Sequence, residues 1–368
     1  MKRRNTLLAF ALITTMALTA CSGGGGNAGS GNAAGGNAAG GNAASGNAAS
    51  GDTAGSSAAE TPAKAKAVSL KLAHTQSTDH PVHKSLEKFA ELVNEKTNGE
   101  VTVEIFANGV LGDERKYIES LQTGLLDMAK VSIDSMENFE KLYSVFTIPY
   151  AFEGMDHGRK FMNSEKMEDF YTSTIDSLDI RGLTWYNSGG RNYYARDKAI
   201  LTPDDMKGMV MRVQSSQIQI KTVETLGGSA TPVDWGELYT ALQQGVVDGA
   251  DNGIVAFADN NLCEVVKNFS FTEHILSPDI LLIKNSVLEK LTPEQQTAVK
   301  EAARESTAYH DEIWGAAEQA AIDKSKAAGV NIYYPELAPF AEALKPLQEE
   351  LIENEQVAEY LKIIDDMK

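Results

Sequence analysis

Strands and helices alternate along residues 68–106 with the spacing of a βαβ unit, and this pattern limits the possible folds more than any other feature. An alternating apolar segment, Val68 to His74, precedes a helical stretch, Ser85 to Lys96, and a second alternating segment, Val101 to Phe106. Two parallel strands need a crossover of a dozen or more residues, which the helix supplies. Because similar alternation continues along the chain, the sequence predicts an α/β fold.

The folded part of the chain is long for a single hydrophobic core. Residues 67–368 amount to about 300 residues, and single cores rarely grow beyond about 250 to 300 residues. We therefore expect two lobes. Within the first of them, residues 161–177 are expected to be helical.

A long helix is predicted near the C-terminus. Thr292 is a good cap, Pro293 suits the first helical position, and Gln295 suits the third. No glycine or proline follows until Gly315, and the helical pattern resumes through Lys326. A continuous helix of about 35 residues would be about 50 Å long and would brace both lobes. The alternative is two shorter helices separated near Gly315.

The N-terminus has the features of an export signal. Three cations, Lys2 to Arg4, precede an apolar run from Leu7 to Leu18, which is too short for a bilayer that needs about 20 residues. Leu18 to Cys21 resembles a lipobox, so residues 1–20 are predicted to be a lipoprotein signal peptide and Cys21 to be lipidated. The alternative is an ordinary signal with an incidental cysteine.

Residues 21–66 are expected to tether the folded part to the lipid. After Cys21 the composition collapses to Gly, Asn, Ala and Ser, which cannot bury enough apolar surface to offset the entropy of ordering. We therefore predict a flexible linker.

The chain is acidic. Its net charge is −18, and loss of the three cations Lys2, Arg3 and Arg4 with the signal leaves −21. This charge disfavours nucleic acid as a partner, and the sequence has no basic stripe or recognition motif. An anionic small ligand remains possible, because distant surface carboxylates are largely screened beyond about 8 Å.

Two arginines are predicted to lie on rigid elements. Arg191 follows a glycine-containing turn after a strand, and Arg212 lies within an apolar alternation. A guanidinium offers a planar fork that binds a carboxylate bidentately and keeps its charge. These arginines therefore point to a free acid as ligand. The alternative for Arg212 is an ion pair with an internal Asp or Glu.

Enzyme and metal signatures are weak. The sequence has no Gly-x-Ser-x-Gly elbow, phosphate loop or Cys-x-x-Cys, so neither catalysis nor a cofactor is expected. His80 and His83 are three apart, but Pro81 spoils a helical pair of ligands and no third ligand is evident, so no metal is expected. The segment from His74 to His80, which includes Gln76, is instead expected to line the cleft and to cap a helix.

Four sequence motifs stand out after Val68. The most specific is WGELYTALQQGVVDG, residues 235–249, followed by Asp251-Asn252. The others are NGVLGDER at 108–115, IPYAF at 148–152 and DDMKG at 204–208. Through these motifs the chain, from about Val68 to the C-terminus, resembles the solute-binding proteins of tripartite ATP-independent periplasmic (TRAP) transporters, of the dicarboxylate-binding DctP type.

The resemblance implies a two-lobed, periplasmic-binding-protein-like fold of type II with a long helix spanning both lobes. It places residues 67–189 and 278–317 in the first lobe and residues 190–277 and 318–368 in the second.

The resemblance also implies roles for individual residues. Arg212 would make the main salt bridge to a ligand carboxylate, with Arg191 and Asn252 beside it. Asp251 stands where the family has Glu, which shortens the side chain by one methylene, and Gln214 stands where many members have proline.

These features together predict a lipid-anchored receptor on the outer face of the cytoplasmic membrane that delivers an organic acid to TRAP membrane subunits. Hydroxyl and amide groups, including the hydroxyl of Ser215, are expected around a single positively charged site. This arrangement favours a sugar acid such as a hexuronate or aldonate. A C4-dicarboxylate would need a second focus, for which only Arg115 or Arg196 is at hand. Gln76, His80 and Arg115 are expected to contribute from the first lobe. A monomer is expected, and a ligand-sensing module remains the alternative to transport.

Overall fold

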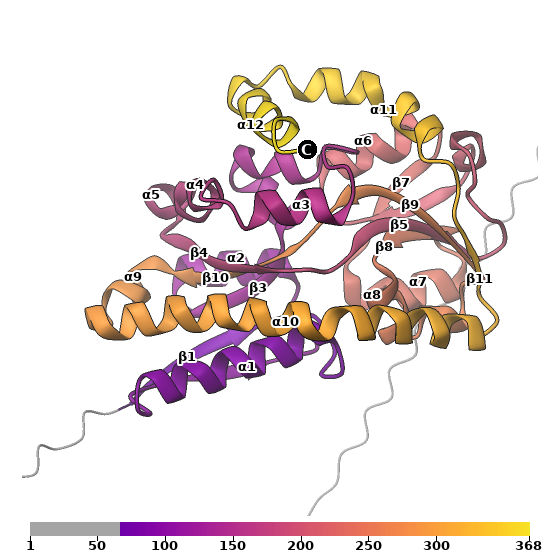
Figure 1. Cartoon of the computed structure of the whole chain (residues 1–368). Coiled ribbons are helices and arrows are strands. Elements are labelled where there is room, and N and C mark those ends of the chain that lie inside the picture. The colour runs from indigo at the N-terminus through magenta and orange to yellow at the C-terminus, as the bar shows by residue number, and fades with distance from the viewer. Residues whose placement is uncertain (1–66) are drawn as a thin grey trace, which may run out of the picture. The chain divides into compact units, whose positions relative to one another are not determined.

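Two β-sheets flanked by helices organise residues 67–368, the part of the chain that the structure, a computed structural model, describes (Figure 1). These residues belong to one compact unit, Pro62–Lys368. The expected signal peptide, Cys21 and the whole of the expected linker lie outside the described residues.

The first sheet has five strands in the order β2-β1-β3-β10-β4, and β10 runs antiparallel to both of its neighbours. Its strands are β1 (Val68–Ala73), β2 (Val101–Phe106), β3 (Met128–Ser132), β4 (Ile180–Tyr186) and β10 (Asp279–Lys284). The helices around it are α1 (Pro81–Lys96), α2 (Glu114–Thr123), η1 (Ile133–Asn138), η2 (Lys141–Phe146), α3 (Met155–Met162), α4 (Met167–Ser173), α5 (Ile175–Leu178), α9 (Asn285–Glu289) and α12 (Glu355–Asp365). We call this sheet and its helices the first lobe.

The second sheet has six strands in the order β11-β9-β5-β8-β6-β7. Its strands are β5 (Gly190–Ala195), β6 (Val210–Val213), β7 (Ser229–Pro232), β8 (Gly249–Asn252), β9 (Asn268–Leu276) and β11 (Asn331–Tyr333). The helices around it are η3 (Pro203–Met206), α6 (Gln217–Thr225), η4 (Trp235–Glu237), α7 (Leu238–Gln244), α8 (Ile254–Asp259), η5 (Leu262–Glu264) and α11 (Ala338–Leu351). This sheet and its helices form the second lobe.

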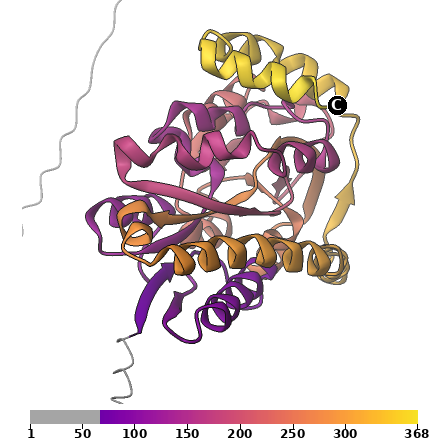
Figure 2. The same ribbon diagram turned by 60° about the vertical axis from the view of Figure 1, so that its left-hand side comes forward.

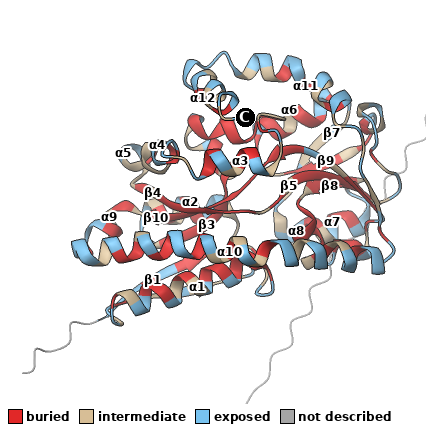
Figure 3. Ribbon diagram, viewed as in Figure 1, coloured by how far each residue is buried: buried red, intermediate tan, exposed pale blue. Residues whose placement is uncertain are grey.

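The central strands of both sheets are buried, as the red strands of Figure 3 show. Alternate residues of β10 enter separate cores: Ile280 and Leu282 pack in one, and Leu281 and Ile283 in the other. Central strands covered on both faces read as continuous apolar runs, because both sets of side chains must leave water.

The chain crosses between the lobes at two adjacent places. Residues 187–189 join β4 to β5, and residues 277–278 join β9 to β10. Because β4 pairs with β10 and β5 pairs with β9, the two crossings lie side by side. We therefore propose the same lobe boundaries as those expected from the sequence, between residues 189 and 190 and between residues 277 and 278.

A single helix of 35 residues, α10 (Pro293–Ala327), packs on both lobes (Figures 1 and 2). Thr292 and Gln295 form a reciprocal capping box at its start. Val299 lies in a core of the first lobe, whereas Trp314 lies in a core of the second. The predicted fold class is thus confirmed, and the helix continues through Gly315 rather than dividing there. Within residues 67–368, no helix combines the length and apolar character that a membrane crossing requires.

The prediction of one helical stretch over residues 161–177 is wrong. This region contains the end of α3 and two further short helices, α4 and α5. Polar side chains at the breaks form tertiary hydrogen bonds. Asn163 accepts a hydrogen bond from Trp185 Nε1 at 3.0 Å, and Thr174 donates its hydroxyl to the Ile180 carbonyl at 2.9 Å.

The expected assignment of residues 318–368 to the second lobe does not hold for α12. Tyr360 packs edge-on against Phe170 with ring centroids 4.8 Å apart, and His157 Nε2 donates to the Ile364 carbonyl at 2.8 Å. The apolar face of α12 is thus buried in a core of the first lobe. The chain returns there because α11 packs on α6 and then turns back at residues 352–354.

Candidate functional site

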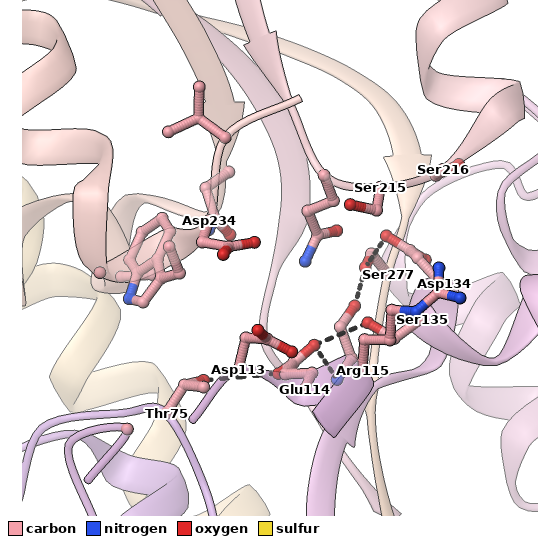
Figure 4. Close-up of a pocket in the computed structure, with 18 of the residues that line it drawn as sticks. Thr75, Asp113, Glu114, Arg115, Asp134, Ser135, Ser215, Ser216, Asp234 and Ser277 are labelled. Carbon is pink, nitrogen blue, oxygen red and sulfur yellow. Dashed lines mark hydrogen bonds between the residues drawn. The ribbon is translucent and has the colours of Figure 1, made fainter. Parts of the chain in front are cut away.

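A cavity of about 420 Å³ lies between the lobes and is lined by residues of both. Strands β1 and β3 lead into its first-lobe wall, and the parallel strands β6 and β8 lead into its second-lobe wall. Figure 4 shows Asp113 and Glu114 on one side of this cavity and Asp234 on the other. Ligands of α/β proteins bind at the carboxyl ends of parallel strands, so this cavity is the candidate site.

Arg212 borders the cavity from β6 and is almost entirely buried, with 2% of its surface exposed. Its Nε donates to the Val233 carbonyl at 2.8 Å, and its Cζ lies 5.7 Å from the centroid of the Trp235 ring. No Asp or Glu of residues 67–368 forms an ion pair with it, and its Nη1 is buried without a hydrogen-bond partner. Burial lowers the pKa of Arg212, and the nearby positive charge of Arg191 adds to this shift. The guanidinium is therefore held in place and available to an anion.

Arg191 also borders the cavity, but its fork is occupied by Asp251. Arg191 Nε and Nη2 each lie 2.7 Å from an oxygen of Asp251, and Nη2 also donates to the Asp251 carbonyl at 3.0 Å. Although burial raises the pKa of Asp251, the charge and hydrogen bonds of Arg191 hold it well below its usual range. The internal ion pair that was considered for Arg212 is thus formed by Arg191 instead. Asp251, although one methylene shorter than the Glu of the family, still reaches Arg191.

Asp134 connects the lobes at the cavity. Its Oδ2 accepts hydrogen bonds from Ser277 Oγ at 2.6 Å and from Gln219 Nε2 at 2.9 Å, and lies 3.6 Å from Arg191 Nη1. Its Oδ1 is buried without a partner among the described residues. Burial raises the pKa of Asp134 to about 7, although the charge of Arg191 opposes the shift.

Glu114 lies on the first-lobe wall at the start of α2. Its carboxylate accepts hydrogen bonds from Ser132 N at 3.0 Å and Ser135 Oγ at 2.8 Å, and it lies 3.4 Å from the buried Lys130. Figure 4 shows Glu114 beside Ser135. We did not predict Glu114 or Asp134 from the sequence. The available signal was their position, since polar residues just after a strand or at a helix start commonly line such clefts.

The other predicted residues divide into two groups. Those that border the cavity with Arg191 and Arg212 are Gln76, Arg115, Ser215 and Asn252. Arg115 is 64% exposed at the rim and forms an ion pair with Glu119. His80 and Asp251 do not border the cavity.

The predicted cleft histidines serve the protein structure. His80 caps α1 by accepting a hydrogen bond from Val82 N at 3.2 Å. His83 Nδ1 lies 2.9 Å from His74 Nε2. No grouping of three or more potential metal ligands occurs in the described part of the chain.

Two lobes joined by adjacent crossings, with an inter-lobe cavity and a buried guanidinium that has no carboxylate partner within residues 67–368, define a binding protein for a small anion. Residues 72–355 match the family described as bacterial extracellular solute-binding protein, family 7. The chain belongs to this family, which confirms the predicted resemblance.

Curated relatives and solved structures agree with this membership. The chain is 37% identical to the uncharacterized protein YiiZ of Salmonella typhimurium over 77% of this chain and 86% of that protein. It is 26% identical to the 2,3-diketo-L-gulonate-binding periplasmic protein YiaO of Escherichia coli over 84% of this chain and 95% of that protein.

Among solved structures, a TRAP periplasmic solute-binding protein of Anaerococcus prevotii with bound D-glucuronate has a TM-score of 0.79 and 30% identity, covering 82% of this chain and 98% of that one. A TRAP periplasmic solute-binding protein of Xanthobacter autotrophicus with bound β-D-galacturonate has a TM-score of 0.78 and 30% identity, covering 81% of this chain and 100% of that one.

Proposed function

We propose that this protein is an extracytoplasmic receptor that captures a sugar acid, a hexuronate or an aldonate, and delivers it to the membrane subunits of a TRAP transporter. The observation that carries the proposal is Arg212, whose buried guanidinium borders the cavity without a carboxylate partner in the described chain. A ligand carboxylate would supply that partner through charge-assisted hydrogen bonds.

The charges around the cavity favour one ligand carboxylate over two. Arg191 is engaged by Asp251, Arg115 is exposed and paired with Glu119, and Arg196 does not border the cavity. Lys116 lies at the rim in the same segment as Asp113 and Glu114. A second carboxylate, as in a C4-dicarboxylate, would meet these acids and Asp134, whereas ligand hydroxyls can donate to them.

The ligands of similar proteins support the same class. Glucuronate and galacturonate are bound in solved relatives of about 30% identity, and 2,3-diketo-L-gulonate is named for a curated relative. Each of these acids has one carboxylate and several oxygen substituents along its carbon chain. The cavity chemistry of this chain suits that pattern.

In the proposed complex, the Arg212 guanidinium binds the ligand carboxylate bidentately, and Asn252 lies beside that carboxylate. Gln76, Ser215 and Arg115 contribute polar contacts, while Arg191 holds the site together through Asp251. The carboxamide oxygen of Gln76 is buried without a partner in the described structure, so a ligand hydroxyl would satisfy it. The proposal assigns binding and no catalysis or cofactor. A ligand-sensing module would use the same cavity, and loss of uptake on deletion of the gene would distinguish transport.

A thermal-shift screen tests the ligand class. We expect glucuronate, galacturonate and aldonates to raise the unfolding temperature, because a ligand that binds only the native state stabilises it by about 2.7 kcal/mol at a hundredfold excess over Kd. Succinate and malate should give little shift at the same concentration. Stabilisation by the C4-dicarboxylates alone would reverse the assignment.

We further propose that Cys21 is lipidated, so that the receptor acts as a monomer anchored to the outer face of the cytoplasmic membrane. The motif from Leu18 to Cys21 supports this anchoring. Replacing Cys21 by Ser should move the protein from the membrane fraction to the soluble exported fraction, because it removes the thiol that is acylated. An unchanged membrane fraction would show that Cys21 is not the anchor.

A further inference from the structure

A second cavity, of about 160 Å³, adjoins the main one. Thr75, Asn108, Trp235 and Gly236 border both cavities, so the two share a wall made of residues from both lobes. The other residues that line the second cavity are Ser77, Leu238, Tyr239, Asn260 and Leu262. The cleft therefore extends past the site proposed for the sugar acid.

The second cavity differs from the first in its charge. None of the residues that line it is a Lys, Arg, Asp or Glu, whereas the main cavity is lined by several of each sign. The Ser77 hydroxyl and the Trp235 Nε1 are buried and have no hydrogen-bond partner among residues 67–368. Unsatisfied buried polar groups are costly, so these two atoms mark places where a bound hydroxyl would be stabilised.

The second cavity lies close to the proposed carboxylate site. Trp235 contacts both places, since its ring centroid is 5.7 Å from Arg212 Cζ and the residue also borders the second cavity. A carboxylate at Arg212 and a group in the second cavity are thus separated by one aromatic side chain. That separation suits a sugar ring that carries the carboxylate and is linked to a second ring.

The lining groups also indicate the chemistry of the second ring. Tyr239 and Trp235 offer aromatic surface, and Ser77 and Asn260 offer hydroxyl and amide groups, a combination that suits the apolar and hydroxyl-bearing parts of a sugar. A second uronate would place its carboxylate where no cation lines the cavity.

From these observations we infer that the cleft accepts acids of two sugar units, with a terminal uronate beside Arg212 and a linked neutral sugar in the second cavity. The inference rests on the proposed function, because it requires a uronate in the main cavity. It extends that function from monosaccharides to aldobiouronic acids.

The test is isothermal titration of the whole exported chain with four probes: glucuronate, cellobiouronate, digalacturonate and cellobiose. Cellobiouronate should bind at least as tightly as glucuronate. Digalacturonate should bind about tenfold or more weakly than cellobiouronate, and cellobiose should not bind, since it has no carboxylate for Arg212.

Two substitutions at Asn260 form a matched pair. Both Asn260→Phe and Asn260→Ala remove the hydrogen bond from Nδ2 to the Ala256 carbonyl, but only phenylalanine fills the second cavity. Asn260→Phe should lower cellobiouronate affinity about tenfold or more relative to Asn260→Ala, because the second ring loses its space and its hydrogen bonds. Glucuronate affinity should be the same in both variants.

The outcomes separate this inference from the proposed function. Binding of glucuronate without cellobiouronate would overturn the inference and leave the proposed function standing. Binding of neither acid would overturn both. Cellobiouronate affinity that is equal in the two Asn260 variants, or a parallel loss of both acids in Asn260→Phe alone, would also overturn the inference.

Discussion

Replacing Arg212 by methionine is expected to lower affinity for glucuronate by about 2 to 5 kcal/mol, or roughly thirtyfold to a few thousandfold. Methionine fills the buried position with a long unbranched side chain but supplies no hydrogen-bond donor for the ligand carboxylate. Arg212→Lys keeps the charge and loses the fork, so its affinity should fall less, by about 1.5 to 3 kcal/mol. Titration calorimetry on both variants measures these losses.

The stability of the ligand-free protein should barely change in Arg212→Met. The substitution leaves no carboxylate of the described chain without its ion-pair partner. The lost hydrogen bond from Arg212 to the Val233 carbonyl contributes about 1 kcal/mol of unfolding free energy. Arg159→Met is a matched control, because Arg159 also lies over a tryptophan, Trp185, yet pairs with Asp311 and does not border the cavity. Normal affinity in Arg212→Met, or an equal loss in the control, would defeat the carboxylate-clamp hypothesis.

The two arginines have different environments, and this difference could not be predicted from the sequence. Both arginines border the cavity. The sequence points to both, because each lies on or beside an expected strand and the family motif marks it. Which one has an internal partner depends on the pairing of β5 with β8, where Tyr193 lies opposite Asp251. These strands are distant along the chain, and no local pattern gives the strand order of the second sheet.

The same distinction applies to the fold. The strand Val101–Phe106 and the helix from Pro293 were predicted almost to the residue, because alternation and a capping box are local signals. The packing of α12 on the first lobe was missed, since an amphipathic pattern shows which face of a helix is buried but not which surface covers it. Asp134 was missed for a similar reason, because its partner Gln219 belongs to the other lobe.

Replacing Asp251 by asparagine is expected to cost about 3 to 5 kcal/mol of unfolding free energy, because it leaves the buried Arg191 without its bidentate counterion. Asp134, 3.6 Å from Arg191 Nη1, is already bound to Ser277 and Gln219 and compensates in part only. Urea unfolding of the ligand-free protein at neutral pH measures the loss. A cost below about 1 kcal/mol would contradict the importance of this ion pair.

Two further measurements separate the ion pair from a general packing defect. The double variant Arg191→Met, Asp251→Asn should be more stable than Asp251→Asn alone, because removing both charges abolishes the unpaired one. The pKa of Asp251 is lowered on folding, so its contribution is present above the unfolded-state pKa of about 3.9 and is lost as the pH falls through the lower folded-state pKa. The stability difference between the wild-type protein and Asp251→Asn should therefore shrink as the pH falls below about 4. A difference that stays constant down to acid-induced unfolding would mean that the substitution acts through packing rather than through charge.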